Sequence, residues 1–590
     1  MEPTRVSSRT FLAVSPRVAC LLPGVLALGV LLPGTFGVSL VDRDEGWYAQ
    51  VSREMLESGD WLMPRYLGEP WLAKPPLLYW CVAASFRVLG LHEWAGRLVS
   101  VLAMVGVVCL VVMLTREMYD RRVAVFAGVT FITAGLPAVV GKMLLTDGLL
   151  LLGIMAATVL LWRIAVRGPT VLRAVRFWAA VGLAILTKGP AVVLFVAALG
   201  VGLLVYTRTA GGGGAEVRSS ENLAAQGRGQ ATRPGQGTRW VVSPVLWLTL
   251  PVAVVIAAPW YVYVAQRAGG TLVSQFFGYE IVSRIIGTPH GHGGPPGYHL
   301  LVGLAGWLPW TVLVPGAVIE AWRGRRDDRV AGLMLVWAGL PWLVLELIHS
   351  KLPHYVLPCY VPLAILLGRM WANGLDGETT RFQRFVLGVW AAVPLLLGVM
   401  AVAAGVVWRA ETWSAAPAAA GVPLLAGFAV VGWLVWRARL RAAWVAAVGT
   451  AWLFHVVLGL GVLPALEPYR LSRLVAARVN AVSEPTTEVL ACGYDEPSLF
   501  FYLERPARVM RVETLPEALR PGPQPRVVIA RDESLRQAGL RPASDAGVWL
   551  RVRGFNYVKG RHEILWIVPV PAAESACANP RRGSYGKTPP

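Results

Sequence analysis

Apolar runs of membrane-spanning length recur through this 590-residue chain and limit its fold more than any other feature. A helix needs about 20 predominantly apolar residues to cross the hydrocarbon core of a bilayer, and on that criterion we predict about 13 spans. They fall near residues 18–40, 98–115, 123–141, 147–165, 176–188, 190–207, 243–264, 298–320, 330–348, 355–371, 386–408, 422–436 and 442–463. The predicted fold class is therefore a polytopic α-helical membrane protein.

Cationic gaps between alternate spans predict the orientation of the chain. Lysine and arginine outnumber aspartate and glutamate by 55 to 35, which gives a net charge of +20. In a nucleic-acid-binding protein such cations cluster on one face or one helix. Here the arginines recur in short gaps on the side of the N-terminus, which is typical of cytoplasmic loops. We therefore expect a cytoplasmic N-terminus, a lipid bilayer around the spans and no nucleic-acid partner.

Composition divides the chain into parts of different character. Residues 1–464 form the predicted transmembrane domain, whose polar outer loops are 41–97 and 265–297. Residues 208–240 are glycine-rich and polar, so we expect a disordered cytoplasmic linker that buries no core. In residues 465–590, β-branched runs alternate with Gly, Pro and Asp, which predicts a small extracytoplasmic α/β domain.

Two features bear on processing and on the redox compartment. The first apolar run follows three arginines, as in a signal peptide, but it is too long for an h-region and lacks a clear cleavage site. We expect it to remain as the first span. Of the six cysteines, only Cys492 and Cys577 lie in the polar tail. A disulfide between them stays open, because a sequence cannot fix the pairing.

A polar loop at residues 42–80 follows the first span and contains two groups suited to catalysis. Asp44 and Glu45 begin a pattern, continued by Tyr48, that suits a short amphipathic helix on the membrane surface. The alternative is a solvated helix start with Asp44 as its N-cap. Lys74 is followed by two prolines that restrict the backbone, so its ammonium is well placed to meet a phosphate. The alternative is an interfacial lysine that snorkels to water.

The outer ends of later spans carry further ionisable groups. Asp147 begins an apolar span, where it either caps the helix or serves a function. Lys351 and Tyr355 lie at the outer end of another span. With the acidic pair and the cation of the first loop, these groups suit a membrane-anchored phosphate donor and a hydroxyl that must lose a proton.

The second outer loop, at residues 265–297, concentrates cationic and imidazole groups. Arg284 adds a further cation to the predicted outer face. His290 and His292 have the spacing H-x-H, which is compatible with metal ligands. Without nearby Cys or Asp partners, that metal signal is weak.

A series of motifs between about residue 40 and residue 505 resembles a known family. The motifs read DEGWYAQVSREMLESGDWLMP, KPPLLYW, TDG, GLAILTKGP, PWYVYV, FFGYEIVSR with HGHGGPPGYH, GWLPW, SKLPHYVLPCYVPLA and DEPSLFFYLERP. Their order is similar to that of the polyprenyl-phosphate-dependent glycosyltransferases of the GT-C class, above all the bacterial lipid A aminoarabinose transferases and the protein O-mannosyltransferases. The resemblance implies a GT-C-like fold in the inner (plasma) membrane, with the C-terminal domain outside the cytoplasm.

The same resemblance implies an inverting transfer of a sugar from a polyprenyl-phosphate carrier to an extracytoplasmic acceptor: a lipid, a polysaccharide or a protein hydroxyl. By motif position, Asp44 is the general base that takes the acceptor's proton, with Glu45 beside it and Asp147 near the cavity. The polyprenyl phosphate becomes the leaving group, whose developing charge needs stabilisation. The implied phosphate-binding residues are Lys74, Arg284, Tyr355, Tyr48, His292 and Lys351.

Two positions depart from the family's pattern. Relatives often carry a glutamate directly before the lysine of the KP motif and a histidine directly after the glutamate of the FF…R segment. This chain has Ala73 and Ile281 at those places. If those groups hold a divalent metal in the relatives, that site is lost here. We therefore assign no cofactor and no metal, and leave His290 with His292 open as a substitute pair.

Two other functions stay open. A transporter or flippase of a polyprenyl-linked sugar would use the same cations for binding, but it has no need of Asp44 as a base. A degenerate, non-catalytic member of the family would act through its soluble tail. Neither the identity of the sugar nor that of the acceptor follows from the sequence.

Overall fold

The computed structural model describes residues 16–210, 238–268, 293–374, 380–408, 416–467, 470–540, 549–556 and 559–573, with single positions between 270 and 287. The chain forms two compact units. The first comprises Met1–Phe36, Leu72–Leu78 and Arg97–Val462, and the second comprises Gly37–Trp71, Tyr79–Gly96 and Leu463–Pro590. The predicted linker at 208–240 falls largely outside the described residues.

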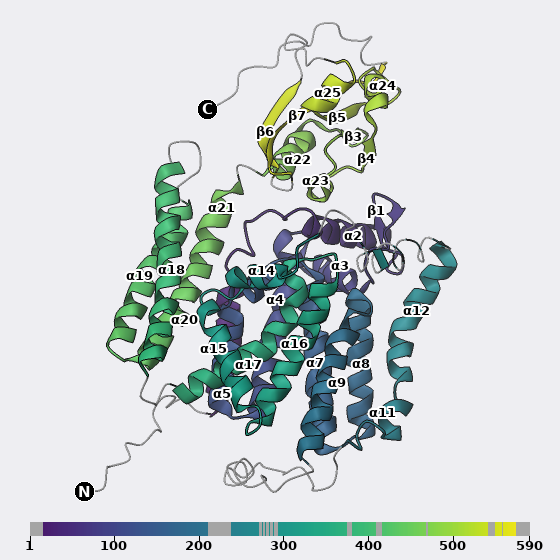
Figure 1. Cartoon of the computed structure of the whole chain (residues 1–590). Helices are drawn as coiled ribbons and strands as arrows, with labels where there is room; N and C mark the ends of the chain where they lie inside the picture. Colours follow the sequence, from purple (N-terminus) through teal and green to yellow (C-terminus); the bar gives the residue numbers. More distant parts are fainter. Residues whose placement is uncertain are drawn as a thin grey trace, which may run out of the picture. The chain divides into compact units, whose positions relative to one another are not determined.

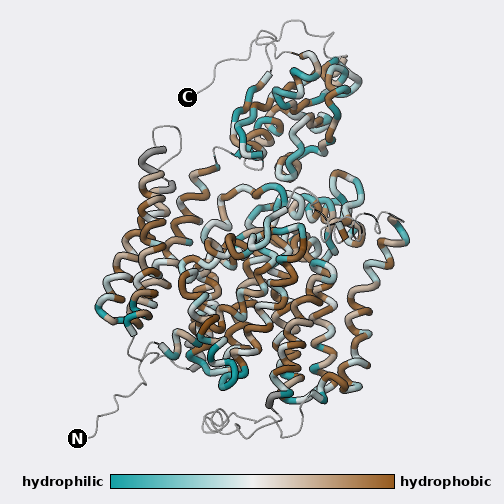
Figure 2. Tube along the Cα trace, in the orientation of Figure 1, coloured by the Kyte–Doolittle hydropathy of each residue, from teal (hydrophilic) through white to brown (hydrophobic). Residues whose placement is uncertain are grey.

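The first unit is a bundle of apolar helices, along which Figure 2 shows hydrophobic residues over most of each helix. The α4 helix begins in the second unit and continues into the bundle. The elements, drawn in Figure 1, are α1 (Pro16–Leu31), α4 (Glu93–Met118), α5 (Arg121–Thr133), α6 (Gly135–Lys142), α7 (Thr146–Arg167), α8 (Val171–Lys188), α9 (Ala191–Ala210), α11 (Pro244–Leu248), α12 (Pro251–Ala268), α14 (Tyr298–Gly306), η3 (Thr311–Leu313), α15 (Val314–Gly324), α16 (Arg329–Leu347), η4 (Pro353–Val356), α17 (Leu357–Gly374), α18 (Arg381–Trp408), α19 (Ala416–Trp436), α20 (Leu440–Val457) and η5 (Leu458–Val462).

The helices confirm a polytopic helical membrane protein but include fewer long spans than the sequence predicts. Among the described residues, nine helices are long and apolar enough to cross a membrane, and the bent pair α5–α6, with 64° between its halves, makes a tenth. The predicted span at 298–320 is broken into the short helices α14 and α15. The predicted span at 176–188 is part of α8, which also carries Arg173 and Arg176. Helix breaks and added charge therefore account for much of the difference between the predicted and the observed number of spans.

Short polar side chains cap helices at one end of the bundle. The side chains of Asp120, Thr170 and Asp328 accept hydrogen bonds from backbone N–H groups at the starts of α5, α8 and α16. Such caps satisfy donors that the first helical turn leaves unpaired. Each of these helices starts in one of the cationic gaps that predict the cytoplasmic side.

A cluster of tryptophans forms part of the bundle's core. Trp310 stacks on Trp390, with 5.9 Å between ring centroids, and Trp371 lies edge-on to both rings. The indole of Trp310 donates to the Thr133 hydroxyl at 3.0 Å, and that of Trp390 donates to the Pro309 carbonyl at 3.0 Å. These bonds let large rings be buried without leaving their N–H groups unpaired.

The second unit contains a mixed sheet of five strands in the order β4-β3-β5-β7-β6 (Figure 1). Strand β3 pairs parallel with β4 and β5, whereas β7 pairs antiparallel with β5 and β6. Its elements are α2 (Asp44–Ser58), β1 (Arg65–Tyr66), β2 (Glu69–Pro70), α3 (Leu77–Leu89, which begins in the first unit), α21 (Leu463–Ala465), α22 (Leu471–Val482), β3 (Glu488–Cys492), α23 (Pro497–Tyr502), β4 (Ala507–Met510), η7 (Val512–Thr514), α24 (Leu515–Ala518), β5 (Arg526–Arg531), α25 (Asp532–Gln537), β6 (Leu550–Asn556) and β7 (Arg561–Val570).

The sheet has an apolar core on each face, because side chains alternate along a strand. Val489 and Ile529 pack into one core with α22 and α23. Cys492 and Val528 pack into the other, where Leu515 and Leu535 cover the opposite face. The predicted C-terminal α/β domain is therefore confirmed as a mixed β-sheet domain. Most of the first polar loop, residues 41–97, belongs to the same compact unit as this sheet, and Leu72–Leu78 belongs to the first unit.

Candidate functional site

In the first unit, Asp147 lies in a group of polar side chains from three separate segments. Its carboxylate is 2.7 Å from the Lys188 Nζ and 3.7 Å from the His354 Nε2, and it also accepts a hydrogen bond from the Thr146 hydroxyl at 3.2 Å. The Lys188 ammonium lies 5.2 Å from the ring centroid of Tyr355. We call Asp147, Lys188, His354 and Tyr355 the Asp147 cluster.

The Asp147 cluster forms because three helix ends meet. Asp147 is in the first turn of α7, Lys188 is the last residue of α8, and His354 and Tyr355 lie in η4 directly before α17. Asp147 is only 6% exposed, so its charge requires a close partner, which Lys188 supplies. A lysine ammonium has three N–H donors, and the ion pair with Asp147 occupies one of them.

Two other predicted cations of the first unit donate to the main chain. The Nζ of Lys351, which is 5% exposed, donates to the Ile348 carbonyl at 2.6 Å. The Nζ of Lys74, which is half-buried, donates to the Ala73 carbonyl at 3.0 Å. Both side chains are thus held close to their own loops.

In the second unit, the predicted acidic pair divides into a partly exposed and a buried carboxylate. Asp44 is the first residue of α2, and Arg43 occupies the N-cap position, so the alternative of Asp44 as the cap is wrong. Asp44 is half-exposed and accepts no hydrogen bond or ion pair from any residue that the structure describes. Glu45 is fully buried and accepts from the Val41 backbone N–H at 2.7 Å. The two neighbouring carboxylates thus differ, because Glu45 is bound to the backbone inside the unit and Asp44 is partly exposed to solvent.

Tyr48, one turn further along α2, is packed among aromatic side chains. It is 6% exposed, and its ring centroid lies 6.1 Å from that of Tyr79. Nearby, burial raises the pKa of Tyr66, and the negative charges of Asp495 and Asp42 raise it further. Tyr66 therefore stays protonated as a neutral phenol on this acidic side of the unit.

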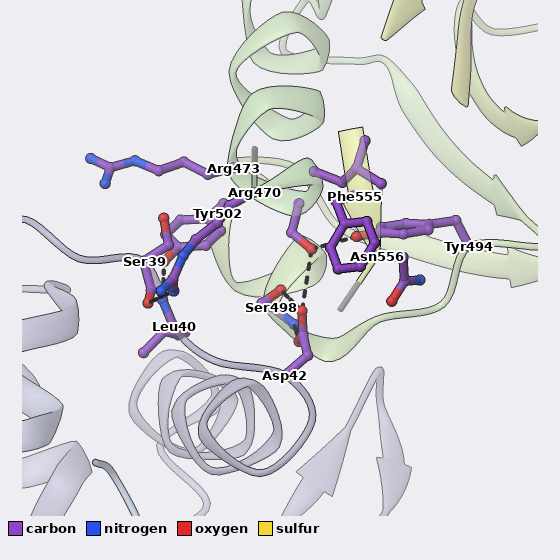
Figure 3. A pocket seen from close by; sticks show the side chains of 12 residues that line it. Ser39, Leu40, Asp42, Arg470, Arg473, Tyr494, Ser498, Tyr502, Phe555 and Asn556 are labelled. Atoms are coloured by element: carbon purple, nitrogen blue, oxygen red, sulfur yellow. Dashed lines mark hydrogen bonds between the residues drawn. The ribbon is translucent and has the colours of Figure 1, made fainter. Parts of the chain in front are cut away.

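Asp42, just before α2, accepts hydrogen bonds from the C-terminal part of the second unit. Its carboxylate accepts from the Ser498 backbone N–H at 2.8 Å and from the Ser498 hydroxyl. Figure 3 shows Asp42 and Ser498 in a pocket that Tyr494 and Tyr502 also line. The Ser472 hydroxyl contacts the same carboxylate at 3.5 Å and forms a 2.9 Å hydrogen bond with the Tyr494 hydroxyl.

Several sequence predictions fall on residues that the structure does not describe. Arg284, His290 and His292 are among them, as is Cys577 of the predicted disulfide. Cys492 is buried, and that burial raises the pKa of its thiol. In the described parts of the chain, no group of three His, Cys, Asp or Glu side chains is arranged to hold a metal ion.

The structure adds three residues that sequence reasoning did not place in the site. Lys188 ends an apolar run directly before Gly189-Pro190, a position that resembles an interfacial anchor. His354 lies with Lys351 and Tyr355 at the predicted outer end of one span, but the sequence assigns it no role in the site. Asp42 stands two residues before Asp44 of the predicted pair, but its partner Ser498 is 456 positions away in the sequence.

The N-terminal half of the helical bundle matches the model of a known protein family. Residues 25–271 match the family model of dolichyl-phosphate-mannose-protein mannosyltransferases. This part of the chain is thus similar to that family. The matched residues include the first polar loop, Asp147 and Lys188.

Relatives that carry a functional name match a longer part of the chain. The undecaprenyl phosphate-alpha-4-amino-4-deoxy-L-arabinose arabinosyl transferase of Erwinia tasmaniensis is 31% identical over 60% of this chain and 59% of its own length. The transferase of the same name from Edwardsiella ictaluri is 31% identical over 63% of this chain and 64% of its own. The chain thus spans less than two thirds of these curated relatives.

The fold likeness extends over nearly the whole chain. The crystal structure of ArnT from Cupriavidus metallidurans bound to undecaprenyl phosphate matches with a TM-score of 0.71 and 23% identity. The match covers 94% of this chain and 98% of that one. The helical bundle and the C-terminal sheet domain are therefore both covered by a match to one known fold.

Proposed function

We propose that this protein transfers a sugar from a polyprenyl-phosphate carrier to an acceptor hydroxyl on the extracytoplasmic face of the inner membrane, with inversion at the anomeric carbon. The observation that carries the proposal is the contrast within residues 42–45. Asp42 and Glu45 are engaged in hydrogen bonds, whereas Asp44 is half-exposed without a described partner. A general base needs such a free carboxylate within reach of the proton that it removes.

In the proposed reaction, Asp44 removes the proton of the acceptor hydroxyl as that oxygen attacks the anomeric carbon. A new C–O bond to the acceptor forms while the C–O bond to the carrier phosphate breaks, and the bonding electrons leave with the phosphate. The proton therefore ends on Asp44 and the negative charge ends on polyprenyl phosphate.

The Asp147 cluster and Lys74 are the proposed partners of that phosphate in the first unit. Lys188 keeps N–H donors beyond its ion pair with Asp147, and charge-assisted hydrogen bonds to phosphate are among the stronger polar contacts. Tyr355 and Lys351 flank the same segment before α17, and Arg284 and His292 remain proposed contributors. The names of the aminoarabinose transferase relatives support undecaprenyl phosphate as the carrier and 4-amino-4-deoxy-L-arabinose as the first sugar to test.

The test is sugar transfer by the purified full-length protein in lipid nanodiscs. Undecaprenyl phosphate carrying a labelled sugar is supplied with envelope lipids, and the modified acceptor is detected by mass spectrometry. We expect Asp44→Asn to abolish transfer while the affinity for undecaprenyl phosphate is retained. Asp60→Asn is the matched control, because an asparagine oxygen can still accept from the Leu62 and Met63 backbone N–H groups.

The same assay separates the proposed transferase from a transporter. If the wild-type protein transfers sugar and Asp44→Asn transfers it equally fast, Asp44 is not the base. The transporter would be favoured by a different result. The labelled carrier would then move across the membrane of proteoliposomes, and no modified acceptor would form even with a complete set of envelope lipids.

A further inference from the structure

The start of α2, which presents Asp44, is held on both sides by the segment around α23. Before Asp44, the Asp42 carboxylate accepts from the backbone N–H and the hydroxyl of Ser498. Ser498 is only 1% exposed, so these hydrogen bonds are shielded from competing water. Figure 3 shows Asp42 directed at Ser498 in the pocket.

After Asp44, Gly46 brings α2 directly against the same serine. A Cβ atom at position 46 would lie 2.5 Å from the Ser498 backbone nitrogen and 2.9 Å from the Asp42 Oδ1. Both distances are shorter than side chains tolerate, so only glycine permits this approach. The backbone on either side of Asp44 is therefore fixed against one residue of the C-terminal segment.

A second contact from the C-terminal segment reaches the residue directly before Asp44. The Arg43 Nε lies 3.5 Å from the carboxylate of Glu496, which is 1% exposed. Glu496 in turn accepts a 3.1 Å hydrogen bond from Asn556 at the end of β6. Because the Arg43 side chain is 41% exposed, we expect this ion pair to contribute less than the Asp42–Ser498 contact.

The segment that leads into α2 is also held by hydrogen bonds to the C-terminal part of the chain. The Leu40 backbone N–H donates to the Tyr502 hydroxyl at 2.7 Å, and the Ser39 backbone N–H donates to Glu467 at 2.7 Å. Arg470 donates to the Ser39 carbonyl at 2.6 Å. Residues 39–46 thus depend on the C-terminal part of the chain for their position, while the Asp44 side chain has no partner among the residues that the structure describes.

We propose that Asp42 and Ser498 are positioning residues that set the place of the Asp44 carboxylate, so that the C-terminal sheet domain takes part in catalysis through Asp44. This inference rests on the proposed function, in which Asp44 is the base. A displacement of about 1 Å of a reacting group can lower a rate by about 100-fold. Loss of the Asp42–Ser498 contact therefore changes the catalytic step rather than the binding of the donor.

The experiment compares Ser498→Ala, Asp42→Ala and the double variant in the full-length protein. Turnover is expressed per donor-binding site, counted by titration with undecaprenyl phosphate, so that unfolded molecules do not enter kcat. We expect kcat to fall about 10-fold in Ser498→Ala and about 10- to 100-fold in Asp42→Ala, with the donor KM unchanged. The double variant should be no slower than Asp42→Ala, because both changes break one contact.

Ser483→Ala is the matched control in the same domain. The Ser483 hydroxyl donates to the Val479 carbonyl one turn earlier in α22, so its removal leaves residues 39–46 untouched. A purely structural contact would lower the melting temperature of Ser498→Ala and Asp42→Ala while kcat per donor-binding site stayed at the wild-type value. That result would overturn the positioning role.

Hydrogen exchange separates a failure of this inference from a failure of the proposed function. We expect peptides covering residues 39–48 to exchange faster in Asp42→Ala and Ser498→Ala than in wild type or Ser483→Ala. Unchanged exchange would overturn the inference whatever the activity. Faster exchange in a protein whose wild type transfers no sugar would instead reject the proposed function, and with it the catalytic meaning of the contact.

Discussion

Two groups of charged side chains lie at opposite ends of α17 in the first unit. The Asp147 cluster includes His354 and Tyr355, directly before the helix begins. The second group includes Arg369, near the end of the helix. The 18 residues of α17 span about 27 Å at 1.5 Å per residue, close to the thickness of a bilayer's hydrocarbon core.

The second group, which we call the Asp328 network, consists of Asp328, Arg369, Glu320 and Tyr119. Arg369 lies 2.6 Å from Asp328 and 2.8 Å from Glu320, and the Tyr119 hydroxyl donates to Asp328 at 3.1 Å. Asp328 also caps α16 by accepting from the Ala331 backbone N–H at 3.0 Å. The Asp328 carboxylate is therefore shared among three donors from the protein itself, which is the pattern of a structural network.

The Asp147 cluster also combines a carboxylate, a cation and a tyrosine, but its hydrogen-bond donors and acceptors are balanced differently. Among the residues that the structure describes, Lys188 has one carboxylate partner, Asp147, and one aromatic ring beside it, and an ammonium has three donors. The His354 Nε2 is 3.7 Å from Asp147, which is too long for a hydrogen bond. The Asp328 network therefore fastens helices together, whereas the Asp147 cluster is the proposed partner of the carrier phosphate.

Replacing the cation of each group should give the largest difference in donor affinity between the two groups. We expect Lys188→Met to raise the Kd for undecaprenyl phosphate about 10- to 100-fold, because a hydrogen bond to a charged group contributes about 1.5–3 kcal/mol. Arg369→Met, the matched change in the Asp328 network, should lower the melting temperature without changing that Kd. Binding is measured on the folded fraction of each variant in nanodiscs. Equal losses of affinity in the two variants would remove the distinction between the groups.

Removing the central acid of the Asp328 network should affect stability alone. We expect Asp328→Ala to lower the free energy of unfolding by about 2 kcal/mol, through the lost helix cap and the lost bond to Arg369. The measurement is reversible denaturation in mixed detergent micelles, with transfer activity recorded per donor-binding site. Asp120→Ala, which removes the corresponding cap of α5, is the control for the capping part. A loss of turnover per site in Asp328→Ala would show that this network also reaches the reaction.

Much of this arrangement could be predicted from the sequence, because part of it depends on local pattern. Apolar runs indicate the helices, and the breaks between them place Asp147 and Tyr355 at helix ends. Lys188 could not be separated from an ordinary interfacial lysine, since its role depends on a carboxylate from another helix. The bond between Asp42 and Ser498 joins positions 456 residues apart, and no local pattern encodes such a pair.

Changing the histidine of the Asp147 cluster should have a smaller effect than changing its lysine. At 3.7 Å from the Asp147 carboxylate, the His354 Nε2 is too far away for a hydrogen bond, whereas the Lys188 Nζ lies at 2.7 Å. We expect His354→Gln to change the Kd for undecaprenyl phosphate less than about threefold, within the range of a weak ion pair. Isothermal titration calorimetry with undecaprenyl phosphate, run on His354→Gln and Lys188→Met side by side, checks that the lysine variant loses more affinity. An effect as large as that of Lys188→Met would mean that His354 itself contacts the phosphate.

Glu320→Gln should produce the smallest change, because Glu320 is the most exposed acid of the Asp328 network. Its side chain is 41% exposed, against 20% for Asp328, so water screens its pair with Arg369. We expect the free energy of unfolding to fall by about 0.5 kcal/mol, as for other exposed pairs, and the Kd for undecaprenyl phosphate to stay the same. The loss should shrink further in high salt, whereas the loss in Asp328→Ala should persist, because the Asp328 pair is less open to ions. A salt-independent loss above about 1.5 kcal/mol would show that Glu320 and Asp328 hold Arg369 as one cooperative unit, and the network would then be tighter than its exposure indicates.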